Sequence, residues 1–424
     1  MLYAIIIILF ILQGLGNLFM LWSLVVALLG IIQNKPVRGS DTPINKFAVI
    51  ICAHNEENAI HGILDSLGDM EYPENAWHAF VLCDHCTDKT AQIASEYPYV
   101  TVYERNDGPT TGKGVVLAWG LEKILKLKKK FDAIMVFDAD NIATPEFMTK
   151  INQTLNRGED VVQCNRLAGE PFTSVVSQWY AVYWGCYSTL YSYARTKLGL
   201  SCFLTGTGFA VRTEIIEKYG WNTSSITEDV EFSVRHCIRG GTVAFDNEAI
   251  CYDEQPSTLK VMLNQLHRWC TGSYQIMRSC SKDWKAAFAK TRSVKLLDNM
   301  LLIAIGPACV LANLSTIIVN TIYMATFKYM RLYQIVSIVL TLVVSWVMMY
   351  LIMRFQKISL KKIWLGLLTF PIFLFFFTVL SLYSLFFPAR TWKKIEHVGI
   401  KAERKKKKQE KKAAKQQAKA PKRP

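Results

Sequence analysis

Charge is scarce in this sequence, and four long stretches contain none at all. Of the 424 residues, 51% are hydrophobic and only 20% are Asp, Glu, Lys or Arg, which excludes a disordered chain. The net charge of +15 is concentrated at one end, because residues 401–424 hold twelve Lys or Arg and two acids. A nucleic-acid-binding protein would spread its basic residues over a folded face, so we expect no nucleic-acid partner.

The sequence also lacks the cysteine spacing of a disulfide framework. Its eleven Cys are scattered, and Cys83 and Cys86 form the only CxxC pair. A structural zinc site of the usual kind needs a second pair, which does not follow. We therefore expect free thiols in a reducing cytosol rather than disulfides or zinc.

The uncharged stretches are candidates for membrane helices, because about 20 apolar residues of helix span a bilayer. They cover residues 2–34, 299–327, 332–353 and 363–389. The first has neither the basic start nor the cleavage site of a signal peptide, so we expect a retained anchor over 1–34. Basic residues follow this anchor and none precedes it, so the positive-inside rule predicts a multi-pass plasma-membrane protein whose residues 35–298 are cytoplasmic.

Two further features concern the membrane region, residues 299–389. Residues 281–298 carry apolar side chains at helical spacing among five basic ones, which predicts an interfacial amphipathic helix; the alternative is an ordinary surface helix. Four plain crossings would leave the basic tail, 390–424, outside the cell, which the positive-inside rule opposes. We therefore expect that 363–389, which contains Pro371, or else another of the three later stretches, makes no simple crossing and that the tail is cytosolic and disordered.

Residues 35–280 alternate between short apolar runs and amphipathic stretches, the pattern of an α/β domain with a largely parallel sheet. The predicted strands are 47–52, 80–83, 100–103, 133–137 and 161–163, and the predicted helices are 56–67, 88–97, 113–127 and 145–156. In such sheets ligands bind at the carboxyl ends of the strands. Polar motifs follow several of these strands.

Two carboxylates end the fourth predicted strand. Asp138 and Asp140 suit Mg²⁺ or Mn²⁺, which bind carboxylates together with substrate phosphate oxygens, although a helix-capping turn would use the same residues. Asp84 ends the second strand and could accept hydrogen bonds from a base or a ribose. Asp88 fits a helix N-cap better, and Asn55 could cap the helix that Glu56 begins.

Glycine-rich segments add a cation and two tight turns. Gly112, Lys113 and Gly114 precede a helix, where backbone and side chain can approach a diphosphate, but the spacing is not that of a Walker motif. The segment 205–208 reads TGTG and precedes Arg212, which fits either a close approach to a ligand or a plain glycine turn.

Two later motifs lie on predicted helices. Glu228 and Asp229 open the helix that continues over residues 230–239, and Gln265, Arg268 and Trp269 lie within a later helix. Each motif alone could be structural, as a helix cap or as an interfacial anchor. Their order after Asp84 and the Asp138 and Asp140 pair is much harder to obtain by accident.

In this order of motifs the sequence resembles the processive membrane-embedded family 2 glycosyltransferases, which include cellulose, chitin, hyaluronan and poly-N-acetylglucosamine synthases. The resemblance covers residues 46 to about 278. It implies a GT-A type nucleotide-sugar-binding domain, residues 35–280, inserted between the N-terminal transmembrane helix and the C-terminal helical membrane region.

The resemblance also implies a role for each site residue. Asp84, Glu56 and Lys113 would bind the nucleotide, and Asp138 and Asp140 would bind its diphosphate and a Mg²⁺ or Mn²⁺ ion. Asp229, with Glu228 beside it, would be the general base that takes the acceptor's proton. Gln265, Arg268 and Trp269 match a QxxRW motif, which would hold the diphosphate and the acceptor sugar.

The function expected from these roles is an inverting, metal-dependent transfer from a UDP-sugar, with glucose or N-acetylglucosamine, that extends a β-linked polysaccharide. The alternative is a non-processive enzyme that adds one or a few sugars to a membrane lipid. A catalytically silent scaffold would not need the base, the acid pair and the Arg and Trp together. Partners would be the donor, the polysaccharide or lipid acceptor, membrane lipids and accessory subunits or a second copy of the chain.

Overall fold

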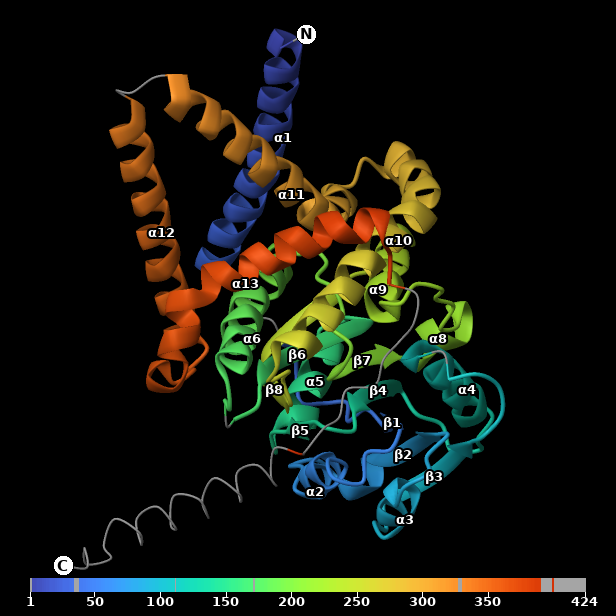
Figure 1. Ribbon diagram of the computed structural model, residues 1–424. Helices are drawn as coiled ribbons and strands as arrows, with labels where there is room; N and C mark the ends of the chain where they lie inside the picture. The colour runs from blue at the N-terminus through green and yellow to red at the C-terminus, as the bar shows by residue number, and fades with distance from the viewer. Residues whose placement is uncertain are drawn as a thin grey trace, which may run out of the picture.

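The computed structural model describes residues 2–33, 38–110, 112–170, 172–326, 330–389 and 399. An α/β domain forms one end of the molecule, and long helices extend from it (Figure 1). The strands are β1 (Phe47–Ala53), β2 (Trp77–Asp84), β3 (Val100–Arg105), β4 (Ala133–Asp138), β5 (Ile142–Ala143), β6 (Val161–Ala168), β7 (Phe209–Arg212) and β8 (Val243–Asp253). They form one sheet in the order β3-β2-β1-β4-β7-β6-β8-β5.

The helices fall into a domain set and a membrane-region set. Those of the domain are α2 (His61–Gly68), η1 (Glu74–Ala76), α3 (Thr90–Ser95), α4 (Lys113–Leu125), α5 (Phe147–Asn156), α6 (Val175–Cys186), η2 (Tyr187–Tyr193), α7 (Ala194–Leu198), α8 (Thr213–Tyr219) and α9 (Glu228–Ile238). The long ones are α1 (Leu2–Ile32), α10 (Leu259–Thr291), α11 (Val294–Thr326), α12 (Met330–Phe355) and α13 (Leu360–Phe386).

The sheet is mixed, whereas the sequence predicted a largely parallel one. β3, β2, β1 and β4 are parallel, but β7 is antiparallel to both β4 and β6, and β5 is antiparallel to β8. After β6 the chain passes through α6, η2 and α7 and returns to the edge at which β6 ended, so β7 must run in the opposite direction. This return brings the TGTG segment beside the end of β4, where the Gly208 N–H donates to Val136 O at 2.8 Å.

Two apolar cores hold the sheet between its helices. Successive side chains of a strand point to opposite faces. Val49 and Ile51 of β1 therefore pack with buried residues of α2, α3 and α5, and Ala48 and Ile50 pack with those of α4, α8 and α9. The buried strands follow from the apolar runs in the sequence, and β6 extends five residues beyond the predicted 161–163.

The helices after β1 and β2 start several residues later than predicted. Asn55 has φ of 55°, and its Oδ1 accepts a hydrogen bond from the Thr87 N–H at 2.7 Å. The expectation that Asn55 caps a helix was therefore wrong, because its side chain ties two loops together instead. Asp88 is not at the N-cap position, but its Oδ1 accepts the N–H of Thr90, the first residue of α3, at 3.0 Å.

The predicted interfacial segment 281–298 is not a separate element. Its first part continues α10 to Thr291, and α11 begins after Arg292, whose φ is 49°. The indole N–H of Trp284 donates to Leu296 O at 2.8 Å, so the end of α10 folds back onto the start of α11.

Three of the described helices are long and apolar enough to cross a membrane: 7–32 in α1, 331–355 in α12 and 360–386 in α13. A fourth span requires that the two halves of α11, 294–304 and 306–322, count as one, although they meet at an angle of 55°. Pro307 lies at this bend, and proline removes a helical hydrogen bond. Candidate membrane helices thus lie at both ends of the chain.

The segment expected to be irregular is one continuous helix. α13 contains Pro371 without a break and lies along α6 and α10, across the direction of α12 (Figure 1). Trp179 Nε1 of α6 donates to Thr369 Oγ1 at 2.9 Å, and the Gly366 N–H donates to Gln178 Oε1 at 2.8 Å. That α13 makes no simple crossing stays a prediction, and the basic tail lies outside the described residues except for Gly399.

Candidate active site

One cavity lies at the carboxyl ends of β1, β2 and β4, and every residue predicted for the site lines it. It encloses about 590 Å³. The residues are Glu56, Asp84, Lys113, Asp138, Asp140, Glu228, Asp229, Gln265, Arg268 and Trp269. The fold thus brings together motifs that lie far apart in the sequence, while the role of each residue stays a prediction.

Asp84 is held firmly at the end of β2. Its side chain is buried, and Arg105 of the neighbouring strand β3 donates to its Oδ1 at 2.6 Å. The His85 ring nitrogen Nδ1 lies 2.9 Å from the same oxygen. A carboxylate fixed in this way can accept hydrogen bonds from a nucleobase or a ribose at one end of the cavity.

Lys113 and Asp138 form an ion pair across the cavity. Asp138 ends β4, and the Lys113 ammonium donates to its Oδ1 and to Gly206 O, the latter at 2.7 Å. Burial lowers the pKa of Lys113, but the Asp138 carboxylate outweighs this effect and the net pKa is raised. Lys113 is therefore cationic at neutral pH.

Asp140 lies deeper than Asp138. Its carboxylate accepts hydrogen bonds from Asn141 Nδ2 at 3.2 Å and from the Glu254 N–H at 3.3 Å. Within the described residues no cluster of three His, Cys, Asp or Glu side chains could hold a metal. Two carboxylates still fit Mg²⁺ or Mn²⁺, because these ions complete their shell with phosphate oxygens and water. Asp138 and Asp140 are thus the residues that would hold the predicted metal.

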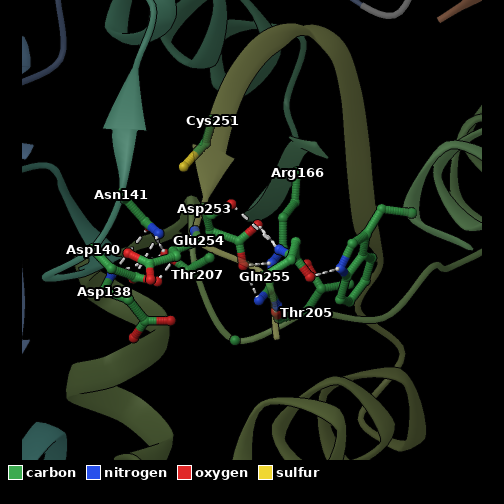
Figure 2. Close-up of polar contacts among 12 residues, drawn as sticks. Asp138, Asp140, Asn141, Arg166, Thr205, Thr207, Cys251, Asp253, Glu254 and Gln255 are labelled. Atoms are coloured by element: carbon green, nitrogen blue, oxygen red, sulfur yellow. Dashed lines mark hydrogen bonds and ion pairs between the residues drawn. The ribbon is translucent and has the colours of Figure 1, made fainter. Parts of the chain in front are cut away.

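The TGTG segment, residues 205–208, contacts both the end of β4 at Asp138 and Arg166 of β6 (Figure 2). Thr207 Oγ1 accepts the Asp138 N–H at 2.9 Å and donates to Asn141 Oδ1. Gly206 and Gly208 have φ of 89° and 63°, a region that favours glycine. A Cβ on Gly208 would lie 2.2 Å from Cys164 Sγ, so the turn needs glycine for space as well.

Glu228 and Asp229 open α9 and line the cavity. Burial raises the pKa of both carboxyls, and the Asp229 charge raises the pKa of Glu228 further. The Val230 N–H, at the start of the helix, acts in the opposite direction on Asp229 but does not cancel the effect of burial. A buried carboxylate with a raised pKa is a stronger base than one in water, which suits proton abstraction.

α10 carries the remaining predicted residues. Arg268 has no ion pair and no hydrogen bond among the described residues, and the buried Gln265 Oε1 is also without a partner in that part of the chain. Trp269 lies on Tyr183, with ring centroids 5.8 Å apart and an interplanar angle of 24°. It therefore lines the cavity as part of an aromatic cluster, and its role with the acceptor stays a prediction.

Sequence reasoning missed three residues that line the same cavity. Arg166 of β6 forms an ion pair with Asp253 at the end of β8, and Glu254 follows it beside Asp140 (Figure 2). The N–H of Gly399 donates to Glu254 Oε2 at 2.8 Å. Two acids after the apolar run 249–251 were a usable signal, whereas Arg166 lay beyond the predicted end of its strand.

Arg212 was predicted near the TGTG turn but does not line the cavity. It ends β7, and its Nη2 donates to Leu155 O at 2.8 Å. Cys86 donates to Ala53 O and accepts the Asn55 N–H, with sulfur distances of 3.6 Å and 3.4 Å. Arg212 thus lies beside Ala133, at the end of β4 opposite the cavity, whereas Cys86 ties together the loops that follow β1 and β2.

Residues 43–272, more than half of the chain, match the family described as Glycosyltransferase like family 2. The chain belongs to this family. A probable glycosyltransferase, YdaM of Bacillus subtilis, is 30% identical over 55% of this chain and 56% of its own length. The β-monoglucosyldiacylglycerol synthase of a Nostoc species is 27% identical over 57% and 51%, and the poly-β-1,6-N-acetyl-D-glucosamine synthase of Staphylococcus epidermidis is 19% identical over 58% and 60%. The chain therefore spans only about half of the length of these curated relatives.

Among solved structures, the mannosyltransferase PcManGT of Pyrobaculum calidifontis, in complex with GDP-Man and Mn²⁺, aligns with a TM-score of 0.58. The alignment covers 85% of this chain and 99% of that one at 15% identity. At this identity the likeness concerns the fold alone, and it agrees with the GT-A-like α/β domain and the candidate membrane helices of this glycosyltransferase.

Proposed function

We propose that this family 2 glycosyltransferase transfers a sugar from a UDP-sugar to an acceptor at the membrane, with inversion and with Asp229 as the general base. The observation that carries the proposal is one cavity lined by Asp229, by the acid pair Asp138 and Asp140, and by Arg268, which has no ion pair among the described residues. Direct displacement needs a carboxylate for the acceptor's proton and positive charge for the departing diphosphate. Both are present in one cavity.

The acceptor that we propose is the headgroup of a membrane lipid. Trp269 lies on Tyr183, which in turn contacts Phe373 and Phe377 of α13 with ring centroids 5.6 Å and 6.4 Å apart. The acceptor side of the cavity is therefore backed by a helix that is apolar enough for a bilayer. The Nostoc relative, named as a lipid glucosyltransferase, supports this choice over the polysaccharide that the sequence analysis ranked first.

Extension of a β-linked polysaccharide is the second candidate, favoured by the QxxRW motif and by the S. epidermidis relative. To decide, the purified protein is incubated with UDP-glucose or UDP-N-acetylglucosamine, Mn²⁺ and vesicles with or without diacylglycerol. We expect UDP release that depends on diacylglycerol and a lipid that carries one or a few sugars. A long polymer formed without diacylglycerol would overturn the lipid proposal.

The metal proposal rests on Asp140 and is tested by Asp140→Asn. The amide is a much poorer ligand than the carboxylate, so Mn²⁺ should no longer tighten UDP binding, and transfer should fall about 10²-fold or more because a Lewis acid contributes several kcal/mol. Calorimetric titration with UDP, with and without Mn²⁺, measures the change. Asp132→Asn, at the amino end of β4, is the matched control. A metal effect that survives in Asp140→Asn contradicts the assignment.

The acceptor role of Trp269 is tested by Trp269→Ala. Loss of the indole face should reduce sugar transfer by about tenfold or more, as aromatic contacts contribute roughly 0.5–1.5 kcal/mol beyond their buried area, while hydrolysis of the donor by water should change little. Both activities are measured on equal amounts of folded protein. Trp284→Ala, on the same helix outside the cavity, serves as the control. Equal losses of transfer and hydrolysis would exclude a specific role with the acceptor.

A further inference from the structure

Lys113, Arg166 and Arg268 line the cavity, and they differ in whether a carboxylate neutralises their charge. Lys113 is paired with Asp138 and Arg166 with Asp253, whereas Arg268 has no such partner among the described residues. The diphosphate of a nucleotide donor carries negative charge and needs an uncompensated cation, which Arg268 supplies. Arg166 is already neutralised by its partner, so its place in the cavity calls for a different ligand.

Arg166 is held rigidly by several contacts (Figure 2). Its Nε donates to Asp253 Oδ2 at 2.7 Å and its Nη2 donates to the same oxygen, while Nη1 donates to Thr205 O at 2.5 Å. The guanidinium lies 4.3 Å from the ring centroid of Trp184. Trp184 and Asp253 are linked in turn through Gln255, so the whole group is fixed before any ligand binds.

These contacts leave part of the guanidinium unused. An arginine has five N–H donors, and the hydrogen bonds of Arg166 within the described residues engage three of them. One N–H remains on each terminal nitrogen. Since Arg166 lines the cavity, these two remaining donors are available to a ligand there.

The position of Arg166 indicates which part of a donor it would meet. A Cβ on Gly206 would lie 3.8 Å from Arg166 Nη1 and 3.6 Å from Asp229 Oδ2, so both side chains end close to this glycine. Asp138 and Asp140 are also close enough to raise the pKa of Arg166. Arg166 therefore lies between the proposed diphosphate and metal residues and the proposed base. The transferred sugar must occupy this same space.

We propose that Arg166, oriented by Asp253, binds neighbouring hydroxyl groups of the hexose ring that is transferred. The inference rests on the proposed function and adds a residue that selects the donor sugar. The ion pair of Arg166 with Asp253 is neutral and does not attract the diphosphate away from Arg268, but its two remaining N–H groups can still donate to hydroxyl oxygens. Gly206 has no side chain to fill the space between Arg166 and Asp229, which leaves room for the ring.

The test compares UDP with UDP-glucose and UDP-N-acetylglucosamine in calorimetric titrations of the unaltered protein, Arg166→Lys and Arg166→Gln. Two lost hydrogen bonds of about 1 kcal/mol each should weaken binding of the sugar nucleotide by roughly tenfold or more, while UDP binding changes by less than about twofold. Arg166→Lys keeps the charge beside Asp253 and separates loss of geometry from loss of charge. Arg38→Gln is the control. It removes the arginine of another ion pair with a buried aspartate, Asp246, and neither residue lines the cavity.

Donor analogues that lack one ring hydroxyl give a second and independent measurement. Removal of the hydroxyl that Arg166 binds should weaken binding to the unaltered protein but not to Arg166→Lys, a coupling that a purely structural role would not produce. The inference would be overturned if the Arg166 variants bound UDP and the sugar nucleotide more weakly by the same factor. It would also be overturned if, for every analogue, the loss of the hydroxyl and the substitution of Arg166 weakened binding independently. If the unaltered protein binds no UDP, the proposed function fails and this inference with it.

Discussion

Asp229→Asn should reduce sugar transfer by about 10² to 10⁴-fold and leave UDP binding nearly unchanged. The amide keeps the shape of the side chain but cannot take the acceptor's proton, and loss of a general base has this size of effect. Asp229 lines the cavity from the first turn of α9. Single-turnover rates with saturating donor, together with UDP titration, separate the loss of chemistry from any loss of binding.

The pH dependence of the unaltered enzyme should agree with this role. Burial raises the pKa of Asp229 above its ordinary value of 3.8, and a base acts only when deprotonated. Activity should therefore be full above the raised pKa and be lost as the pH falls through it, at a higher pH than for an exposed aspartate. Glu214→Gln, which changes an exposed acid of α8 outside the cavity, is the control. Near-normal turnover by Asp229→Asn with a loss in Glu228→Gln would assign the base to Glu228.

The sequence predicted the acidic residues well because their signals are local. A buried apolar run followed at once by Asp84, or by Asp138 and Asp140, defines a strand end and a carboxylate within a few residues. Parallel neighbouring strands then bring such ends to one edge of the sheet. The same local logic placed Glu228 and Asp229 in the first turn of a helix.

The residues that sequence reasoning missed depend on contacts between distant strands. Arg166 and Asp253 are 87 positions apart and meet only because β6 and β8 pair in parallel, with a bulge after Cys164 that sets their register. No periodicity within either segment encodes that register. The antiparallel β7 was missed for a related reason, since its direction follows from the path of α6, η2 and α7 across the domain.

The membrane segments show a different limit of prediction. Composition located the apolar stretches: three lie in helices that could each cross a membrane, and the fourth lies in the bent helix α11. The segment 363–389, with Pro371, was expected to make no simple crossing, yet α13 is continuous, and the bend of 55° lies in α11 near Pro307. α13 is held against α6 by Trp179 and Gln178, and no property of its own sequence indicates these contacts.

Arg268→Ala should reduce transfer by about 10² to 10³-fold, the usual cost of removing one donor that stabilises charge in a transition state. This expectation comes from the balance of charge among the three basic side chains of the cavity. Lys113 is neutralised by Asp138 and Arg166 by Asp253, so within the described residues Arg268 is the cation that is left to meet the diphosphate. Its loss should therefore affect the step in which UDP departs more than the affinity for the neutral acceptor.

Two variants on the same helix make this prediction specific. Arg268→Lys retains the charge without the paired donors of a guanidinium and should recover only part of the rate. Arg278→Ala removes an exposed arginine ten positions further along α10, outside the cavity, and should leave the rate unchanged. Presteady-state release of UDP in each variant isolates departure of the leaving group from product release. A contrary result would be that Arg268→Ala releases UDP at the normal rate and needs only a higher acceptor concentration for half-maximal transfer. The arginine would then belong to the acceptor side. Lys113 would have to exchange Asp138 for the diphosphate when the donor binds.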